Sequence, residues 1–141
     1  MIEISIFIDS SVLVAYVNKR DRNHENSIKI MNGILSAMHG AIIISDYIFD
    51  ETVTVCLART RSLEIAKVFG NYLLNSQMRI LRVDQELFDY AWDIFQQIGK
   101  LSFTDCTILS MIKILGIPHL ATFDKELMKI ASLRGVKIVE N

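Results

Sequence analysis

The sequence lacks the features that would place a protein in a membrane or in an oxidising compartment. No apolar run approaches the ~18 residues of a membrane span. Its 2 cysteines, Cys56 and Cys106, are too few for a disulfide framework. The start of the chain has no basic leader and is interrupted by Glu3 and Asp9, so we do not expect a signal peptide. These absences predict a reduced, cytoplasmic protein with no membrane partner.

Neither sign of charge dominates, and breakers of secondary structure are scarce. Because 15 Lys and Arg stand against 16 Asp and Glu, the net charge is only −1. A long-range basic field is absent, so any polyanion has to be met by a local patch. The chain has 1 proline and 6 glycines, and no repeat or linker divides it. Since 51% of the residues are hydrophobic, disorder is excluded, and we expect one domain over residues 1–141.

Segments typical of strands alternate with segments typical of helices along the whole chain. Apolar, β-branched runs predict strands at about residues 2–8, 41–44, 79–83, 119–122 and 136–139. Apolar residues at helical spacing, with Ser or Asp at the caps, predict helices at about residues 10–17, 24–38, 46–59, 62–75, 84–97, 102–115 and 125–133. Gly40 is expected to stop the second helix. This alternation predicts a layered α/β fold with a mainly parallel sheet.

Acidic residues follow the predicted strands or open the predicted helices. Asp9 comes directly after the first strand, and Asp124 comes just after the fourth. Glu51 lies in the second turn of the helix after the second strand, and Asp105 lies in the first turn of its helix. Strand ends and the following helix starts share one edge of a parallel sheet, where ligands bind. We therefore expect these acids to converge from separate stretches of chain.

Several carboxylates in one pocket need something to offset their charge. At ~4 Å and an effective dielectric near 20, each pair repels by roughly 4 kcal/mol, so protons or cations must compensate. Oxygen ligands without a His or Cys cluster favour Mg²⁺ or Mn²⁺ over Zn²⁺. Carboxylates, such an ion and a substrate phosphate are the parts of metal-assisted phosphodiester hydrolysis.

Each acid by itself also fits a purely structural role. Asp105 stands three residues after Ser102 and could complete a capping box. Asp9 and Asp124 could be ordinary turn residues after strands. Glu51 could lie on a solvated helix face. The apolar residues around most of these acids favour a buried site over four unrelated surface positions.

Four short motifs resemble those of a known family. They read Phe7-Ile8-Asp9-Ser10-Ser11, Ser45-Asp46-Tyr47-Ile48-Phe49-Asp50-Glu51, Leu101-Ser102-Phe103-Thr104-Asp105-Cys106 and Thr122-Phe123-Asp124-Lys125-Glu126-Leu127. In this order and spacing the whole chain resembles a PIN domain, particularly the VapC-like toxins of toxin–antitoxin pairs.

The resemblance implies a three-layer α/β/α fold with about five mainly parallel strands. It also implies a Mg²⁺- or Mn²⁺-dependent endoribonuclease. The catalytic and metal-binding acids that it assigns are Asp9, Glu51, Asp105 and Asp124. Ser10 and Thr122 would be hydroxyls that orient those carboxylates. Two departures from the family are mild: Cys106 stands where a smaller residue is common, and Asp50 is an extra acid without an assigned role.

RNA is the substrate that the resemblance implies, and an antitoxin protein is a partner. Among the basic residues, Lys125 is the best candidate for a phosphate contact because it follows Asp124. The loop that carries Lys19, Arg20 and Arg22 is expected at the sheet edge opposite the acids. The large apolar fraction predicts a hydrophobic surface patch that serves a homodimer or an antitoxin peptide.

Three alternatives stay open from the sequence. A housekeeping RNA-processing nuclease of the same family would have the same residues as a toxin. A phosphoacceptor domain, such as a receiver or a haloacid-dehalogenase-like phosphatase, also places Asp after its first strand, but the latter needs a second Asp where this chain has Ser11. A non-catalytic binding module of this fold would be marked by a lost acid, and none is missing.

Overall fold

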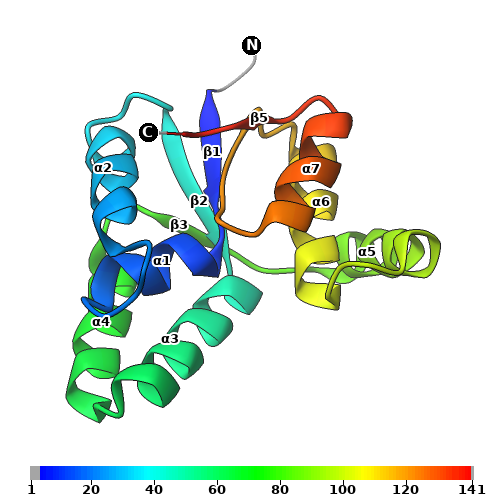
Figure 1. The fold of residues 1–141 in the computed structure, drawn as a ribbon. Coiled ribbons are helices and arrows are strands. Elements are labelled where there is room, and N and C mark those ends of the chain that lie inside the picture. The colour runs from blue at the N-terminus through cyan, green and yellow to red at the C-terminus, as the bar shows by residue number, and fades with distance from the viewer. Residues whose placement is uncertain (1–3, 141) are drawn as a thin grey trace.

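Five parallel strands form the centre of the structure, a computed structural model that describes residues 4–140 (Figure 1). The strands are β1 (Ser5–Ile8), β2 (Ala41–Ser45), β3 (Arg79–Leu81), β4 (His119–Ala121) and β5 (Lys137–Ile138). Their order in the sheet is β3-β2-β1-β4-β5, and every neighbouring pair is parallel. The predicted five-stranded parallel sheet is therefore confirmed. The predicted start of the first strand, residues 2 and 3, lies outside the described residues.

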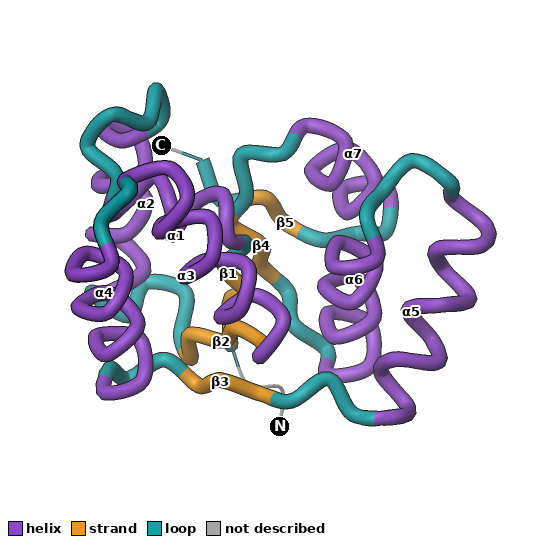
Figure 2. Tube along the Cα trace, turned by 90° about the horizontal axis from the view of Figure 1, so that it is seen from below, coloured by secondary structure: helices purple, strands orange, loops and turns teal. Residues whose placement is uncertain are grey.

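Helices cover both faces of this sheet and confirm the predicted three layers. They are α1 (Ser10–Val17), α2 (His24–Leu35), α3 (Asp46–Thr60), α4 (Leu63–Asn75), α5 (Gln85–Ile98), α6 (Phe103–Leu115) and α7 (Lys125–Leu133). Figure 2 shows α1 to α4 on one side of the strands and α5 to α7 on the other. This division follows from right-handed crossovers, because the chain first moves from β1 towards β3 and then reverses towards β5. The strand order thus reverses at β1, where a ligand crevice is expected.

The central strand is buried on both faces. Ile6, Phe7 and Ile8 of β1 have no exposed surface. A strand covered by helices on both sides reads as a continuous apolar run, which is why its position was plain from the sequence. The two cysteines are also buried, and both are free thiols.

The second helix ends earlier than its pattern predicts. Apolar spacing suggested a helix to Met38, but α2 ends at Leu35 and Ala37 takes a φ of 65°. The chain then turns sharply to enter β2 beside the start of β1. Gly40 makes this turn at a φ of 78°, and a Cβ there would lie 2.0 Å from the carbonyl oxygen of Ile4. Close approach to a neighbouring strand, rather than helix capping, is what requires this glycine.

The short first helix sets the position of the loop that follows it. Figure 1 shows α1 running sideways from the end of β1, while α2 makes the return along the sheet. The loop of residues 18–23 therefore stays near the edge where β1 ends. Within residues 4–140, no helix combines the length and the apolar character needed to cross a membrane.

The Gly40 turn can be tested by adding one methyl group. We expect Gly40→Ala to lower the free energy of unfolding by about 3 kcal/mol or more, because left-handed strain and overlap with a backbone carbonyl add. Gly116→Ala is the matched control, since its φ is 69° but no atom lies within 4 Å of the new Cβ. It should cost only about 1–2 kcal/mol. Urea denaturation measures both, and equal losses would contradict this account of Gly40.

Candidate functional site

A buried carboxylate lies where β1 ends. Asp9 caps the N-terminus of α1 and is only 4% exposed. Its Oδ1 accepts the backbone N–H of Ser10 at 2.8 Å, and its Oδ2 accepts the hydroxyls of Ser11 and Thr122, both at 2.8 Å. Burial without such donors would be costly for a charged carboxylate. These bonds leave Asp9 with one defined orientation.

Hydrogen bonds of the Ser11 and Thr122 hydroxyls connect the ends of β1 and β4. Thr122 donates to Asp9 and also accepts the backbone N–H of Asp124 at 3.0 Å. Ser11 Oγ accepts the backbone N–H of Phe123 at 3.0 Å. The expected contact of Thr122 with a carboxylate is present, whereas the role of Ser11 was missed. The available signal was its position as the second residue of a helix that an Asp caps, because such a hydroxyl can reach back to the cap.

Glu51 reaches the site from the second turn of α3. Its Oε1 accepts the hydroxyl of Ser10, so the expected Ser10–carboxylate contact is present. The N-cap of α3 is Ser45, whose Oγ accepts the N–H of Ile48 at 3.1 Å. The neighbouring Asp50 is exposed and accepts only the hydroxyl of Thr54, at 3.4 Å on its own helix. One position along a helix turns a side chain by about 100°, so Glu51 and Asp50 face different surroundings.

The remaining two acids open α6 and α7. The backbone N–H of Asp105 donates to Ser102 Oγ at 3.1 Å, and Ser102 in turn hydrogen-bonds to the Asp105 carboxylate, as in a capping box. Asp124 caps α7 through its Oδ1, which accepts the N–H of Leu127 at 3.1 Å. Asp105 is half-buried and Asp124 is exposed. Each of these two acids thus has a local structural contact at the start of its helix.

The four acids act on one another electrostatically. Burial raises the pKa of Asp9, the hydrogen bonds from Ser11 and Thr122 oppose this rise, and the charge of Glu51 adds to it. Burial also raises the pKa of Asp105 to about 6, helped by the negative charges of Asp9 and Asp124. Like charges disfavour ionisation only at short range. The structure therefore brings the predicted acids together at one edge of the sheet.

A cavity of about 710 Å³ opens over this edge. The polar and charged residues that line it are Ser10, Ser11, Asn18, Arg20, Asp21, Arg22, Asn23, Glu51, Arg59 and Asp124. The expected location of Arg20 and Arg22 at the opposite edge is wrong, because α1 runs sideways and leaves its loop beside the acids.

Arg59 lies two turns after Glu51 on the same face of α3. Lys125 is exposed beside Asp124, and its predicted phosphate contact stays a prediction.

The donor set fits a hard divalent cation. It consists of carboxylates and hydroxyls, and burial together with neighbouring negative charge raises the pKa of Asp9 and of Asp105. Within residues 4–140, no three His, Cys, Asp or Glu side chains are placed to enclose an ion by themselves. Mg²⁺ commonly takes only one or two carboxylates and keeps several waters, so the open arrangement is compatible with such an ion.

Comparison with known proteins agrees with the sequence motifs. The family model of the PIN domain matches residues 6–133. VapC20 of Mycobacterium tuberculosis, a sarcin-ricin loop cleaving toxin, is 23% identical with a TM-score of 0.81, over 96% of this chain and 99% of that one. FitAcB from Neisseria gonorrhoeae is 17% identical with a TM-score of 0.66, over 96% of each chain.

A third similar structure is VapBC2 from Rickettsia felis, bound to a DNA fragment from its promoter. It is 16% identical with a TM-score of 0.70, over 96% of this chain and 98% of that one. At such low sequence identities, the similarity to these structures supports a shared fold and no more. No curated protein matches the sequence.

The raised pKa of Asp105 predicts how stability depends on pH. The folded chain holds this proton more tightly than the unfolded chain, so the wild type loses stability as the pH rises from about 4 towards 6. Asp105→Asn removes that loss. We expect the variant to exceed the wild type by about 1–3 kcal/mol above pH 6.5 in EDTA, and to match it below about pH 4. Denaturation across this pH range measures the difference.

Asp50→Asn is the matched control for this experiment, because it changes an exposed acid on a neighbouring helix. It should follow the wild type at every pH. A constant offset between Asp105→Asn and the wild type, independent of pH, would show that the carboxylate of Asp105 is not penalised in the folded chain.

Proposed function

The chain belongs to the PIN domain family, and from this we propose that it is a Mg²⁺- or Mn²⁺-dependent endoribonuclease, the toxin of a VapBC-type toxin–antitoxin pair. One observation carries the proposal: acids from four separate segments lie close to one another beside a cavity. Burial raises the pKa of Asp9 and of Asp105, and the charge of Glu51 on the first and the charges of Asp9 and Asp124 on the second add to the rise. All four acids that the family resemblance assigned are present in the sequence, which supports the proposal.

The proposed chemistry divides the work between the ion and the chain. When bound, Mg²⁺ or Mn²⁺ would activate water and offset negative charge on the phosphate oxygens. Asp9 would be one of the residues that hold the ion, because the hydrogen bonds that it accepts from Ser11 and Thr122 fix the orientation of its carboxylate. Glu51 and Asp124 line the cavity and would hold the ion or its waters with it. Asp105 adds charge that only a cation or a proton can offset.

The hydrogen bonds of Asp9 do not favour a phosphoacceptor. The position two residues after Asp9 is Ser11, whose hydroxyl donates to it, rather than the second acid that a haloacid-dehalogenase-like phosphatase needs. The same bonds suit a carboxylate that orients a cation.

Replacing Asp9 tests the nuclease directly. We expect Asp9→Asn to lower the cleavage of single-stranded and structured RNA by on the order of 100-fold or more, because the amide removes the charge that holds the ion. EDTA should abolish wild-type cleavage, and added Mn²⁺ should restore it. Gel analysis of labelled RNA measures both. Asp50→Asn should cleave like the wild type; full activity of Asp9→Asn would defeat the assignment.

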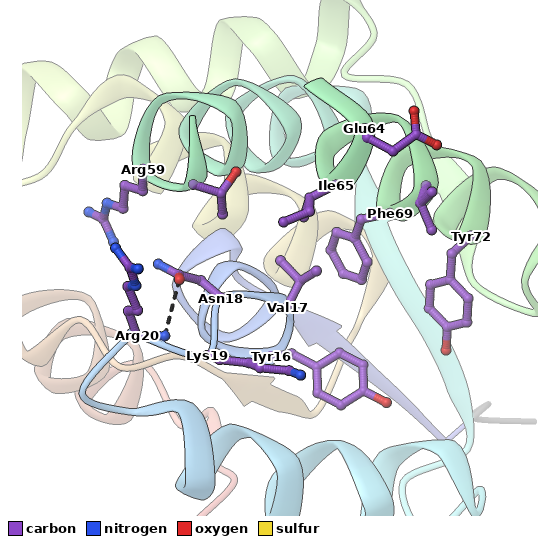
Figure 3. A pocket seen from close by; sticks show the side chains of 12 residues that line it. Tyr16, Val17, Asn18, Lys19, Arg20, Arg59, Glu64, Ile65, Phe69 and Tyr72 are labelled. Carbon is purple, nitrogen blue, oxygen red and sulfur yellow. Dashed lines mark hydrogen bonds between the residues drawn. The ribbon is translucent and has the colours of Figure 1, made fainter. Parts of the chain in front are cut away.

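An apolar groove beside the active site is where we propose that the antitoxin binds. VapBC2 and FitAcB, two of the structural neighbours, are antitoxin complexes. In this chain a groove of about 770 Å³ lies between the end of α1 and the start of α4 (Figure 3). Its apolar wall includes Val17, Ile65, Val68 and Phe69, and basic side chains lie at one end. These features fit a helix with an apolar face and acidic residues beside it.

A charge placed in this groove tests the antitoxin site. Val68 is 59% exposed, so Val68→Glu should leave folding and RNA cleavage unchanged. We expect it to weaken binding of the proposed antitoxin by at least about tenfold, because a carboxylate would be desolvated against an apolar helix. Calorimetry measures the affinity. Leu133→Glu, at an 80% exposed position outside the groove, is the control and should bind normally.

The proposed homodimer has a different candidate surface. Phe88 and Trp92 on α5 are 41% and 49% exposed, and both rings pack on Phe103. Exposed aromatic side chains of this size are enriched where proteins associate. We propose that a second copy of the chain covers them.

A further inference from the structure

Two arginines lie at the rim of the cavity above the acids. Arg20 belongs to the loop after α1, and Arg59 belongs to the last turn of α3. Both line the cavity that contains Glu51 and Asp124. RNA that enters this cavity brings phosphates towards carboxylates, which repel them. A chain with a net charge of −1 needs a local positive group to overcome that repulsion.

The two arginine side chains approach from different elements. Figure 3 shows Arg20 and Arg59 pointing toward one another at one end of the groove. Like charges directed at the same space are unfavourable unless an anion lies between them. Within the described residues, Arg20 has no carboxylate partner, and Arg59 pairs with Asp21 at 3.6 Å. The space between these guanidinium groups therefore suits an incoming anion.

The pairing of Arg59 with Asp21 is easily exchanged. The Arg59 side chain is 60% exposed, and such ion pairs contribute little because water screens them. Asp21 is also engaged by the chain itself, since its Oδ1 accepts the N–H of Asn23 at 2.8 Å. Arg59 can thus turn to a phosphate without leaving Asp21 unpaired.

The loop that presents Arg20 is held in place. Its backbone N–H donates to Asn18 Oδ1 at 3.2 Å, and the N–H of Asp21 donates to the carbonyl of Asn18 at 3.0 Å. At the far end of the loop, His24 Nδ1 lies 2.7 Å from the carbonyl oxygen of Ala15. An ordered loop reduces the entropy lost when Arg20 binds a ligand.

From this geometry we propose that Arg20 and Arg59 together bind a backbone phosphate of the RNA at the mouth of the active site. The inference rests on the proposed function for its ligand. Guanidinium groups suit phosphate because they donate paired hydrogen bonds to its oxygens. A contact with the backbone positions the RNA over the acids but reads no sequence. Arg22 lines the same cavity but, unlike Arg20 and Arg59, does not line the groove beside it.

Binding of RNA to a non-cleaving chain tests the pair. We use Asp9→Asn as the background and a fluorescein-labelled single-stranded oligoribonucleotide as the probe, with anisotropy measured over a series of KCl concentrations. Adding Arg20→Gln and Arg59→Gln should weaken binding about tenfold or more. The slope of log K against log salt should become shallower by about 0.7, the value for one lost phosphate contact on a single strand.

The matched control removes the same charge elsewhere. Lys67 and Lys137 are exposed and line neither the cavity nor the groove. The double variant Lys67→Gln, Lys137→Gln should keep the affinity and the salt slope of the background. If both double variants weaken RNA binding equally, the effect comes from the net charge of the protein rather than from these arginines, and the proposal is overturned. Unchanged binding in the arginine variant would overturn it as well.

Two further measurements separate this proposal from loss of folding and from the proposed function. Arg20→Gln alone leaves the Asp21–Arg59 pair intact, so its loss of affinity reports binding even if the double variant is unstable. In the wild-type background, the arginine variants should raise KM about tenfold and change kcat less than about twofold. Absence of wild-type cleavage would refute the nuclease, while the anisotropy would still decide whether the arginines bind RNA.

Discussion

A carboxylate buried at the point where the strand order reverses determines how the site is built. Asp9 can lie there only because three donors meet it, from the helix that it caps and from the end of β4. The same hydroxyls bond the backbone of Phe123 and Asp124, so the ends of two neighbouring strands are held in one arrangement. The hydrogen bonds that make the burial of Asp9 tolerable thereby set the spacing between Asp9 and Asp124.

Around this carboxylate the structure accumulates negative charge that it does not neutralise. Asp105 has a pKa of about 6 because neighbouring acids and burial both penalise its ionised form. This repulsion lowers the free energy of unfolding of the folded chain. Such a cost is common at functional sites, where a ligand can supply the positive charge that the protein lacks. Arginines at the rim add the opposite sign a short distance away. The cavity therefore has one end suited to a cation and another suited to phosphate.

Most elements of the fold followed from local patterns. Continuous apolar runs marked β1 and β2 because buried parallel strands show no alternation, and side-chain caps such as Ser45 and Asp84 marked helix starts. The end of α2 could not be predicted from such patterns. Apolar spacing continues to Met38, but the helix stops earlier because the chain has to turn at Gly40, close to Ile4. Local periodicity carries no information about such contacts between strands.

The sequence alone determined which residues could form an acidic site, since parallel strand ends share one edge whatever their exact packing. It did not determine how those residues are held or what surrounds them. The donation from Ser11 to Asp9 depends on the distance between two strand ends. The position of Arg20 depends on the sideways direction of α1, which is set by packing against α2 and α3. Directions and distances of this kind arise only when the layers assemble, because no local pattern encodes the angle at which a helix leaves a strand.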